Sequence, residues 1–532
     1  MRPQAGLRTV RSMENTSLAE NSKGLQRESR KIFSGGITPS KIYKATWIVV
    51  SLLVTLVWTP GLVRSFWVDE AGTYWMTHNG PIAAIRSTWH WPGQSVLYAF
   101  IASFFTMHSG PIREFVLRVP TLIGITAAAY FLYRLAESAI GKDAGTIAAI
   151  VFLFHPTTFQ LGIQARPYGL AMAAVTASCW TLYEWVETRH RRFLLGYIVA
   201  SALVIYLQYF FAVVFIAHIA YLLYVFVIEH RGWRWREIMA VYLAVAALVT
   251  PLLPHMRLLL REKNSLVYVA PPTIYELGDT FLTSFIVWGF FLAALLVQFF
   301  LPESSRRPRA LARSFFVLLL FWWLAAPVLF FAASVTSPMR IFVDRYMASS
   351  IPAQALLIGY AGYAVFGALA GRVWVLLAVL LTTASPMAIL AGRNPGFREL
   401  MPFMRIIRQE SISKTPPVFF PSGVSEGSFQ DWRSGLREDS HLFAPFVAYP
   451  MKNKLLPLPH KLNEDAKRYV SQELQTELAT ETEVLFVGMD DDPAFSRWMI
   501  ARMKDAGFDD TVKRTNLYHI IIFKRAPAQK PL

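Results

Sequence analysis

Two adjacent carboxylates, Asp69 and Glu70, follow the first long apolar run of the chain, in the sequence FWVDEAGTYW (66–75). If that run spans a membrane, both residues lie at its surface, where partial desolvation raises the basicity of a carboxylate. Such a group is suited to take a proton from a substrate hydroxyl. The alternative is a solvated loop with interfacial aromatic side chains. Asp69 and Glu70 are therefore candidate catalytic residues.

Two arginines are each followed closely by a tyrosine. Arg166 and Tyr168 lie in the sequence QARPYGL, and Arg345 and Tyr346 lie in FVDRYM. A guanidinium matches a phosphate group with two parallel donors, so both pairs are suited to clamp an anion. The alternative is that each pair anchors a helix end at a membrane interface. We predict that all four residues line a phosphate or substrate site.

A histidine and the single cysteine bear on metal chemistry. His90, in WHWPGQS, is more typical of a polar loop than of a metal site, and we include it among the candidate substrate-binding residues. Cys179 is the only cysteine, which excludes an internal disulfide framework and a multi-cysteine metal cluster. The sequence also has no Walker loop, GxGxxG or HExxH motif. We therefore expect no cofactor.

The composition defines the class of protein that must position these residues. Of 532 residues, 54% are hydrophobic and only 16% are charged, against roughly 25% in ordinary soluble proteins. This excludes a single soluble globular domain, a disordered chain and collagen, and predicts a polytopic membrane protein with a soluble appendage. The net charge of +17 would suggest nucleic acid binding in a soluble protein, but basic cytoplasmic loops explain it here, so we expect no nucleic acid partner.

Eleven apolar runs are near the ~20 residues that a membrane-spanning helix needs. They are residues 45–64, 115–136, 144–161, 167–186, 193–209, 211–229, 237–254, 279–300, 314–333, 347–369 and 373–391. The continuous run 193–229 is too long for one helix, so we divide it by a tight turn around Gln208–Phe210. The predicted fold is an α-helical polytopic membrane protein with about 11 transmembrane helices in residues 44–391.

The positive charges predict an orientation for these spans. With the basic N-terminal tail, residues 1–43, in the cytoplasm, every predicted cytoplasmic loop is basic. The C-terminus is then extracytoplasmic, and the first outer loop is residues 65–114. The outer face carries all the charged candidates: Asp69, Glu70, His90, Arg166 and Arg345.

One apolar run, residues 95–108, is too short to cross a bilayer. We interpret it as an interfacial or re-entrant helix. Counting it as a span would reverse every later loop and place the basic loops outside.

Beyond residue 391 the pattern changes to short strand-like runs and amphipathic helical segments. The predicted strands are residues 418–420, 446–449, 484–487 and 518–523, and the predicted helices are 463–479 and 493–507. Residues 392–532 are therefore expected to form an extracytoplasmic α/β domain.

The order and spacing of several motifs resemble those of GT-C-type glycosyltransferases that use a lipid-phosphate-linked sugar, including the protein O-mannosyltransferases and the aminoarabinose transferase of lipid A. The resemblance covers roughly residues 45–390. The motifs are WVDEAGT (67–73), PGQSVLYAF (92–100), LRVPTLIG (117–124), QARPYGL (164–170) and DRYMASSIP (344–352). The chain departs from bacterial relatives at WPGQSVLY, where HPPLY is common, and at Gln208, where histidine is common.

The resemblance implies roles for the candidate residues. Asp69 would be the catalytic carboxylate and Glu70 its companion, while Arg166 and the pair Arg345–Tyr346 would line the donor pocket. Some GT-C enzymes use a divalent metal, but with Asp69 and Glu70 the only obvious carboxylates we favour none. The resemblance also implies a place in the bacterial inner membrane.

The predicted function is transfer of a hexose or pentose from a polyprenyl-phosphate carrier to a hydroxyl of a lipid, glycan or protein acceptor on the extracytoplasmic face, with inversion at the anomeric carbon. A transporter or flippase for lipid-linked saccharides is the alternative, and such a carrier would tolerate Asn and Gln at positions 69 and 70. A membrane scaffold would leave the arginines and carboxylates without a purpose. No predicted span carries acidic residues across its middle, which argues against a proton-coupled carrier.

Overall fold

The computed structural model describes residues 39–91, 93–108, 110–230, 235–261, 270–281, 311–388, 400–421, 440–459, 462–479, 481–489, 493–515 and 518–525. The chain divides into two units, residues 1–56 and 57–532, and everything that concerns the candidate site belongs to the second. Most of the predicted tail, residues 1–38, and most of the predicted span 279–300 lie outside the described residues.

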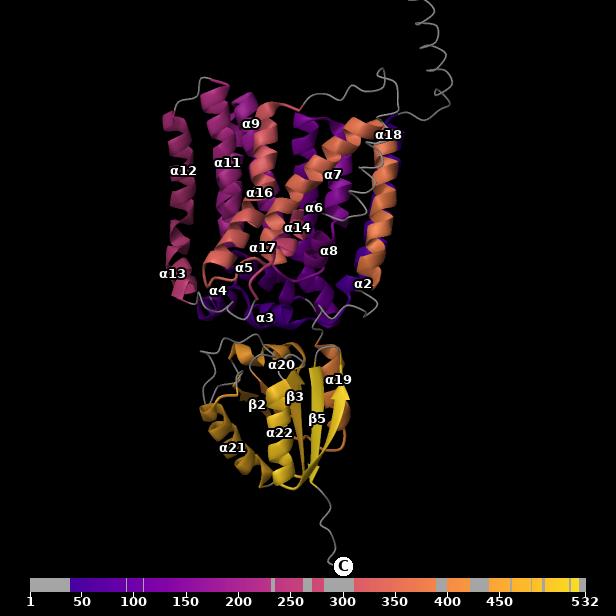
Figure 1. Ribbon diagram of the computed structural model, residues 1–532, viewed down its shortest axis with the longest axis vertical. Helices are drawn as coiled ribbons and strands as arrows, with labels where there is room; N and C mark the ends of the chain where they lie inside the picture. The colour runs from indigo at the N-terminus through magenta and orange to yellow at the C-terminus, as the bar shows by residue number, and fades with distance from the viewer. Residues whose placement is uncertain are drawn as a thin grey trace, which may run out of the picture. The chain divides into compact units, whose positions relative to one another are not determined.

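The first part of the chain is helical. Its α-helices are α2 (Pro39–Leu62), α3 (Val68–Thr77), α4 (Pro81–His90), α5 (Val96–Thr106), α6 (Arg113–Ala139), α7 (Lys142–Phe154), α8 (Pro156–Gly162), α9 (Tyr168–Thr188), α10 (Arg191–Leu207), α11 (Val214–Leu223), α12 (Trp235–Val249), α13 (Leu253–Arg261), α14 (Ile274–Phe281), α16 (Arg313–Thr336), α17 (Asp344–Met347) and α18 (Ile351–Ala388). Several of the long helices run side by side, and α3 lies across one end of them (Figure 1).

The helices begin and end close to the predicted spans, but the count of eleven is not confirmed. Among the described residues, five helices are long and apolar enough to cross a membrane, or six if α7 and α8, bent by 61° at their junction, form one span. The predicted break around Gln208–Phe210 is present, because α10 ends at Leu207 and Gln208 is extended. The last two predicted spans lie within α18, whose two helical parts are separated at Gly367, where the backbone is not helical (φ 67°, ψ −171°).

The short apolar run 95–108 forms α5, which has 11 residues. At 1.5 Å per residue this helix is about 16 Å long, roughly half the thickness of a bilayer core. Ser95 begins it by accepting a hydrogen bond from the Tyr98 N–H. The helix therefore does not cross a membrane by itself, as the sequence predicts.

Helices α6 and α9 approach each other closely at two glycines. A Cβ atom on Gly124 would lie 2.2 Å from the Leu170 backbone nitrogen, and one on Gly169 would lie 2.3 Å from the Thr121 carbonyl oxygen. Only glycine fits at both positions, since the atoms in the way belong to the backbone. This crossing holds the turn before α9, which carries Arg166, directly against α6.

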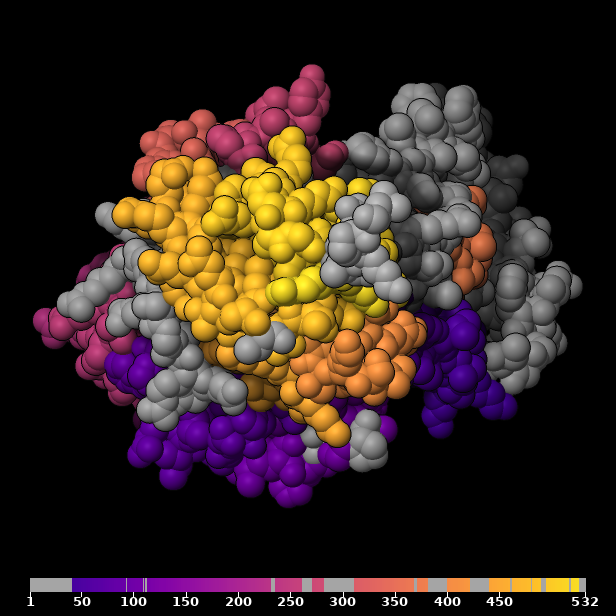
Figure 2. Space-filling model, turned by 90° about the horizontal axis from the view of Figure 1, so that it is seen from below, coloured from indigo at the N-terminus to yellow at the C-terminus, as the bar shows by residue number. Residues whose placement is uncertain are grey.

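The C-terminal part contains a five-stranded sheet in the order β2-β1-β3-β5-β4. The strands are β1 (Val418–Pro421), β2 (Leu455–Leu458), β3 (Glu483–Met489), β4 (Phe508–Arg514) and β5 (Tyr518–Arg525). β1 pairs in parallel with β2 and β3, whereas β5 runs antiparallel to β3 and β4. The predicted α/β character of this region is therefore correct, and Figure 2 shows the region at the centre of the face seen from below.

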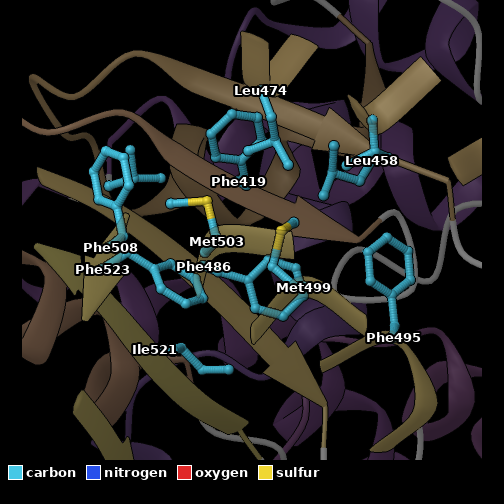
Figure 3. Packing of buried hydrophobic residues seen from close by; sticks show 12 residues of the cluster. Phe419, Leu458, Leu474, Phe486, Phe495, Met499, Met503, Phe508, Ile521 and Phe523 are labelled. Carbon is cyan, nitrogen blue, oxygen red and sulfur yellow. The ribbon is translucent and has the colours of Figure 1, made fainter. Parts of the chain in front are cut away.

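The core of this region lies between the sheet and two helices, α21 (Glu464–Leu478) and α22 (Pro493–Asp505). Figure 3 shows Met499 and Met503 of α22 among the phenylalanines of the strands. On the other face, α19 (Met401–Glu410) packs Phe403 against Tyr518, with ring centroids 4.8 Å apart. Burial on both faces explains why β3 and β5 read as continuous apolar runs.

One predicted strand is wrong, and two strands are missing from the prediction. Residues 446–449 belong to a short helix, α20 (Ala444–Ala448), and its C-cap. A short apolar run is ambiguous between helix and strand, and Pro445 at the first turn favours the helix. The strand β4 was missed because it is a polar edge strand, exposed over most of its length.

Candidate functional site

Both predicted carboxylates lie at the start of α3. Asp69 and Glu70 are the second and third residues of the helix, where negative charge is favourable because of the exposed backbone N–H groups. Both side chains are buried, with 2% and 1% of their surface exposed. Consecutive residues of a helix point about 100° apart, so the two carboxylates face different surroundings.

Glu70 is held by a complete set of partners. Its two carboxylate oxygens accept hydrogen bonds from Nε and Nη2 of Arg118, both at 2.7 Å. The Ala165 N–H donates to it at 2.7 Å, and the Trp67 N–H, at the start of the same helix, donates at 3.2 Å. This carboxylate is a structural centre that joins α3, α6 and the turn before α9.

Arg118 is the partner that sequence reasoning did not select, although it lies in the LRVPTLIG motif. Besides Glu70, it donates hydrogen bonds to the carbonyl oxygens of Gly61, Leu62, Arg64 and Ser65, at 2.8–3.3 Å. Its side chain is 2% exposed. A charged residue inside an apolar run needs a buried partner. The position of Arg118 within the apolar run 115–136 was therefore a signal in the sequence.

Asp69 faces the two predicted arginines. Its Oδ2 atom lies 3.2 Å from Nη1 of Arg345 and 3.5 Å from Nη2 of Arg166. These residues are 276 and 97 positions away in the sequence. The structure thus brings together three of the predicted site residues in one cluster with two positive charges and one negative charge.

Arg166 is held in place by its backbone and by an amide side chain. Its carbonyl oxygen accepts a hydrogen bond from the Thr121 hydroxyl (2.8 Å), and its Nη1 atom donates to Oε1 of Gln94 (2.9 Å). Among the described residues, the buried Nε atom of Arg166 has no hydrogen-bond partner. Burial, the largest influence, opposes the positive charge, but Asp69 and Tyr168 together outweigh it, so the pKa of Arg166 is raised.

Arg345 is the second residue of α17 and is more accessible than Arg166, with 21% of its side chain exposed. Its guanidinium lies 5.5 Å from the centre of the Tyr346 ring, which in turn lies 4.3 Å from that of Phe210. Phe210 belongs to η2 (Tyr209–Val213), directly after the break at Gln208. The segment after α10 therefore forms the wall behind Tyr346.

The other two predicted residues are placed differently. Tyr168 is buried, and the Arg166 guanidinium lies 6.0 Å from the centre of its ring. His90 is exposed at the end of α4, so it is not part of the buried cluster. Gln94 is in the cluster but was not selected, because a single glutamine in a loop carries no signal of its own.

A cavity of about 500 Å³ is lined by Asp344, the residue before Arg345 in the chain. Its polar lining includes Asp344, Glu276, Asp279 and Gln354, from α17, α14 and α18. Burial, and then Glu276, raises the pKa of Asp344. The volume is within the range of small-molecule pockets. Across the described residues, no three His, Cys, Asp or Glu side chains are grouped to hold a metal ion.

Comparison with known proteins supports the motif resemblance. Residues 93–256 match the model of the dolichyl-phosphate-mannose-protein mannosyltransferase family. The apo structure of ArnT from Cupriavidus metallidurans matches with a TM-score of 0.54 and 12% identity, over 91% of this chain and 98% of that chain. The chain has the fold of ArnT. The structure of ArnT bound to undecaprenyl phosphate gives a TM-score of 0.53 and 11% identity, over 90% and 98% of the two chains.

The ArnT likeness and the apolar helices make this chain an integral membrane protein with a GT-C-type fold, as the motifs predict. The family match covers Gln94, Arg118 and Arg166 but neither Asp69 nor Arg345. A search of curated proteins finds no significant match.

Proposed function

We propose that this protein transfers a sugar from a polyprenyl-phosphate carrier to a hydroxyl group of an acceptor. The observation that carries the proposal is the buried Asp69 carboxylate, 3.2 Å from Arg345 and 3.5 Å from Arg166. A carboxylate between two phosphate-binding side chains provides a base and a leaving-group site at one place. The bound undecaprenyl phosphate in ArnT supports a polyprenyl carrier.

The acceptor oxygen would attack the anomeric carbon while the bond from that carbon to the phosphate oxygen breaks. Asp69 takes the proton of the acceptor hydroxyl, and the phosphate leaves with the electron pair of the broken bond. Arg166 and Arg345 stabilise the charge that develops on the phosphate. A single displacement of this kind inverts the configuration at the anomeric carbon.

The arrangement also explains how Asp69 becomes available. Without a donor, the guanidinium groups of both arginines engage the Oδ2 atom of this carboxylate. A phosphate group competes for the same guanidinium donors, and the partnerless Nε atom of Arg166 offers it a further one. Binding of the donor would therefore weaken the hold on Asp69 and leave it free to act as the base.

Glu70 and His90 receive different roles from those first expected. We propose that Glu70 positions the site rather than taking part in proton transfer, because Arg118 and two backbone N–H groups already occupy its oxygens. Tyr168 and Tyr346 form aromatic walls beside the two arginines. His90, exposed at the end of α4, has no proposed part in the transfer step.

We further propose that the site faces the extracytoplasmic side of a bacterial inner membrane, with the N-terminus in the cytoplasm and the C-terminus outside. The basic predicted cytoplasmic loops support this orientation. Nucleotide sugars are not available on that side, so a lipid-linked donor is the appropriate substrate. The sugar would be a hexose or a pentose and the acceptor a lipid, glycan or protein.

The test is a transfer assay with purified protein in lipid. A polyprenyl phosphate carrying a radiolabelled sugar is mixed with a cell-envelope fraction, and the label is followed into the acceptor. Wild type should transfer the label and Asp69→Asn should not. The control is Glu137→Gln, which neutralises a partly exposed carboxylate paired with Arg134. If wild type moves the intact donor across liposomes and never cleaves it, the protein is a transporter and the proposal fails.

A further inference from the structure

The loop that carries Asp69 is bonded to residues more than 330 positions later in the chain. The Phe66 N–H donates a hydrogen bond of 2.7 Å to the Tyr449 hydroxyl, and the Phe66 carbonyl accepts one of 3.0 Å from the Leu400 N–H. Phe66 lies three residues before Asp69. Both backbone polar groups of this residue are therefore satisfied by the C-terminal part of the chain.

Tyr449 is bonded on both sides. Its hydroxyl accepts from Phe66 and donates to Oε1 of Glu114 in α6, at 3.0 Å. The Arg113 guanidinium lies over its ring, 5.0 Å from the centroid, and 5.7 Å from that of Tyr74 in α3. Tyr449 is fully buried. Burial, and then the Glu114 charge, raises the pKa of Tyr449, so its hydroxyl keeps the proton that it donates.

The surrounding contacts come from the same C-terminal segment. Helix α20 packs against α3, and Tyr449 directly follows α20. The His441 ring in η9 (His441–Phe443) lies 5.2 Å from that of Trp91 and 6.2 Å from that of Trp75. A Cβ atom on Gly72 would lie 2.6 Å from the Trp91 ring, so Trp91, which contacts His441, also packs directly against α3.

We propose that Tyr449 is a positioning residue for Asp69, so that the C-terminal α/β region takes part in building the active site. Arg118 holds residues 61–65 and Glu70 from the helical side. Tyr449 and Leu400 hold Phe66 from the other side. Between these two attachments lies only the first turn of α3, which fixes the direction of Asp69 toward the arginines.

This inference rests on the proposed transfer reaction. A small displacement of a reacting group lowers the rate of the chemical step far more than the affinity for substrate. Tyr449→Phe keeps the ring and its contact with Arg113 but removes both hydrogen bonds. We expect it to lower kcat about 10-fold or more, to change the KM for the lipid-linked donor less than twofold, and to increase hydrogen exchange at the Phe66 amide.

The matched control is Tyr469→Phe, which removes a tyrosine hydroxyl from α21, an element on the core of the C-terminal sheet. It should keep the wild-type kcat, KM and exchange at Phe66. A second variant, Glu114→Gln, keeps an acceptor oxygen for Tyr449 but removes its charge. We expect a smaller fall in kcat, again with little change in KM, and this variant decides the question if Tyr449→Phe does not fold.

The outcomes separate this inference from the proposed function. If wild type transfers sugar, Asp69→Asn is inactive and Tyr449→Phe keeps the wild-type kcat, the positioning role is wrong and the reaction stands. A rise in KM without a fall in kcat would also overturn it, because that result indicates a part in donor binding. If wild type itself transfers no sugar, the proposed function fails first.

Discussion

Two neighbouring ion-pair clusters at the start of α3 differ in their distances and in the number of arginines that each carboxylate faces. Glu70 and Arg118 form two hydrogen bonds of 2.7 Å, and four carbonyl groups take the remaining donors of Arg118. Asp69 instead faces two arginines, Arg345 and Arg166, at 3.2 and 3.5 Å.

The difference separates a structural pair from the proposed binding site. A closed pair with balanced charge has no capacity for a ligand, and its geometry is set by the protein alone. The longer contacts of Asp69 and the Nε atom of Arg166, which has no hydrogen-bond partner among the described residues, leave a donor for an anion. Adjacent carboxylates of the same helix can therefore serve opposite purposes, and mutation of each cluster should give a different result.

The largest effect is expected from removing the cation of the Glu70–Arg118 pair. Arg118→Ala leaves Glu70 buried without its cation, which should lower the free energy of unfolding by about 3–5 kcal/mol. Thermal unfolding in detergent measures this change. The control on the same helix is Arg134→Ala, whose pair with Glu137 is partly exposed and should contribute less than about 1 kcal/mol. Equal melting temperatures for the two variants would contradict the structural role of Arg118.

The next effect concerns the base. Asp69→Asn should slow sugar transfer by ~10²-fold or more while the melting temperature stays close to that of wild type. Asn has nearly the same shape but cannot take the acceptor proton. The measurement is the transfer rate at saturating donor, beside a thermal melt. Glu70→Gln should instead mainly lower the melting temperature, with a smaller effect on the transfer rate. Wild-type transfer by Asp69→Asn would remove the base assignment.

A smaller effect is expected at Arg166, the proposed phosphate-binding arginine. Arg166→Ala should raise the KM for the donor by roughly 10- to 100-fold, since a hydrogen bond to a charged group is worth about 1.5–3 kcal/mol. Arg166→Lys should recover only part of this loss, because lysine lacks the planar two-donor fork. Donor titrations of both variants give the measurement. If both keep the wild-type KM, Arg166 is only an interfacial anchor.

The smallest expected effect is a gain in affinity for the lipid phosphate rather than a loss. Because Asp69 competes with the phosphate for the arginines, Asp69→Asn should bind polyprenyl phosphate roughly three- to tenfold more tightly, about 0.6–1.4 kcal/mol. Equilibrium binding of a fluorescent polyprenyl phosphate without sugar measures it. Weaker binding by this variant would mean that the carboxylate does not compete with the ligand.

Local patterns in the sequence predicted much of the fold. Hydropathy located helices such as α6 and α16 within a few residues, and motif spacing predicted the GT-C-type fold that the ArnT likeness supports. The number of spans was not predictable to the same degree, because helices such as α9 and α10 fall short of a clear span by composition or length. The strand predicted at residues 446–449 was wrong because a four-residue apolar run has no definite period.

The sequence by itself determined which residue types are available: carboxylates after the first apolar run, and arginines beside tyrosines in two later motifs. It did not determine their partners, because nothing in the sequence shows which of Arg118, Arg166 and Arg345 contacts which carboxylate. Only the tertiary structure divided the roles. The helical twist turns Glu70 toward Arg118 and Asp69 toward the other two arginines, and the glycine crossing of α6 and α9 brings Arg166 within reach.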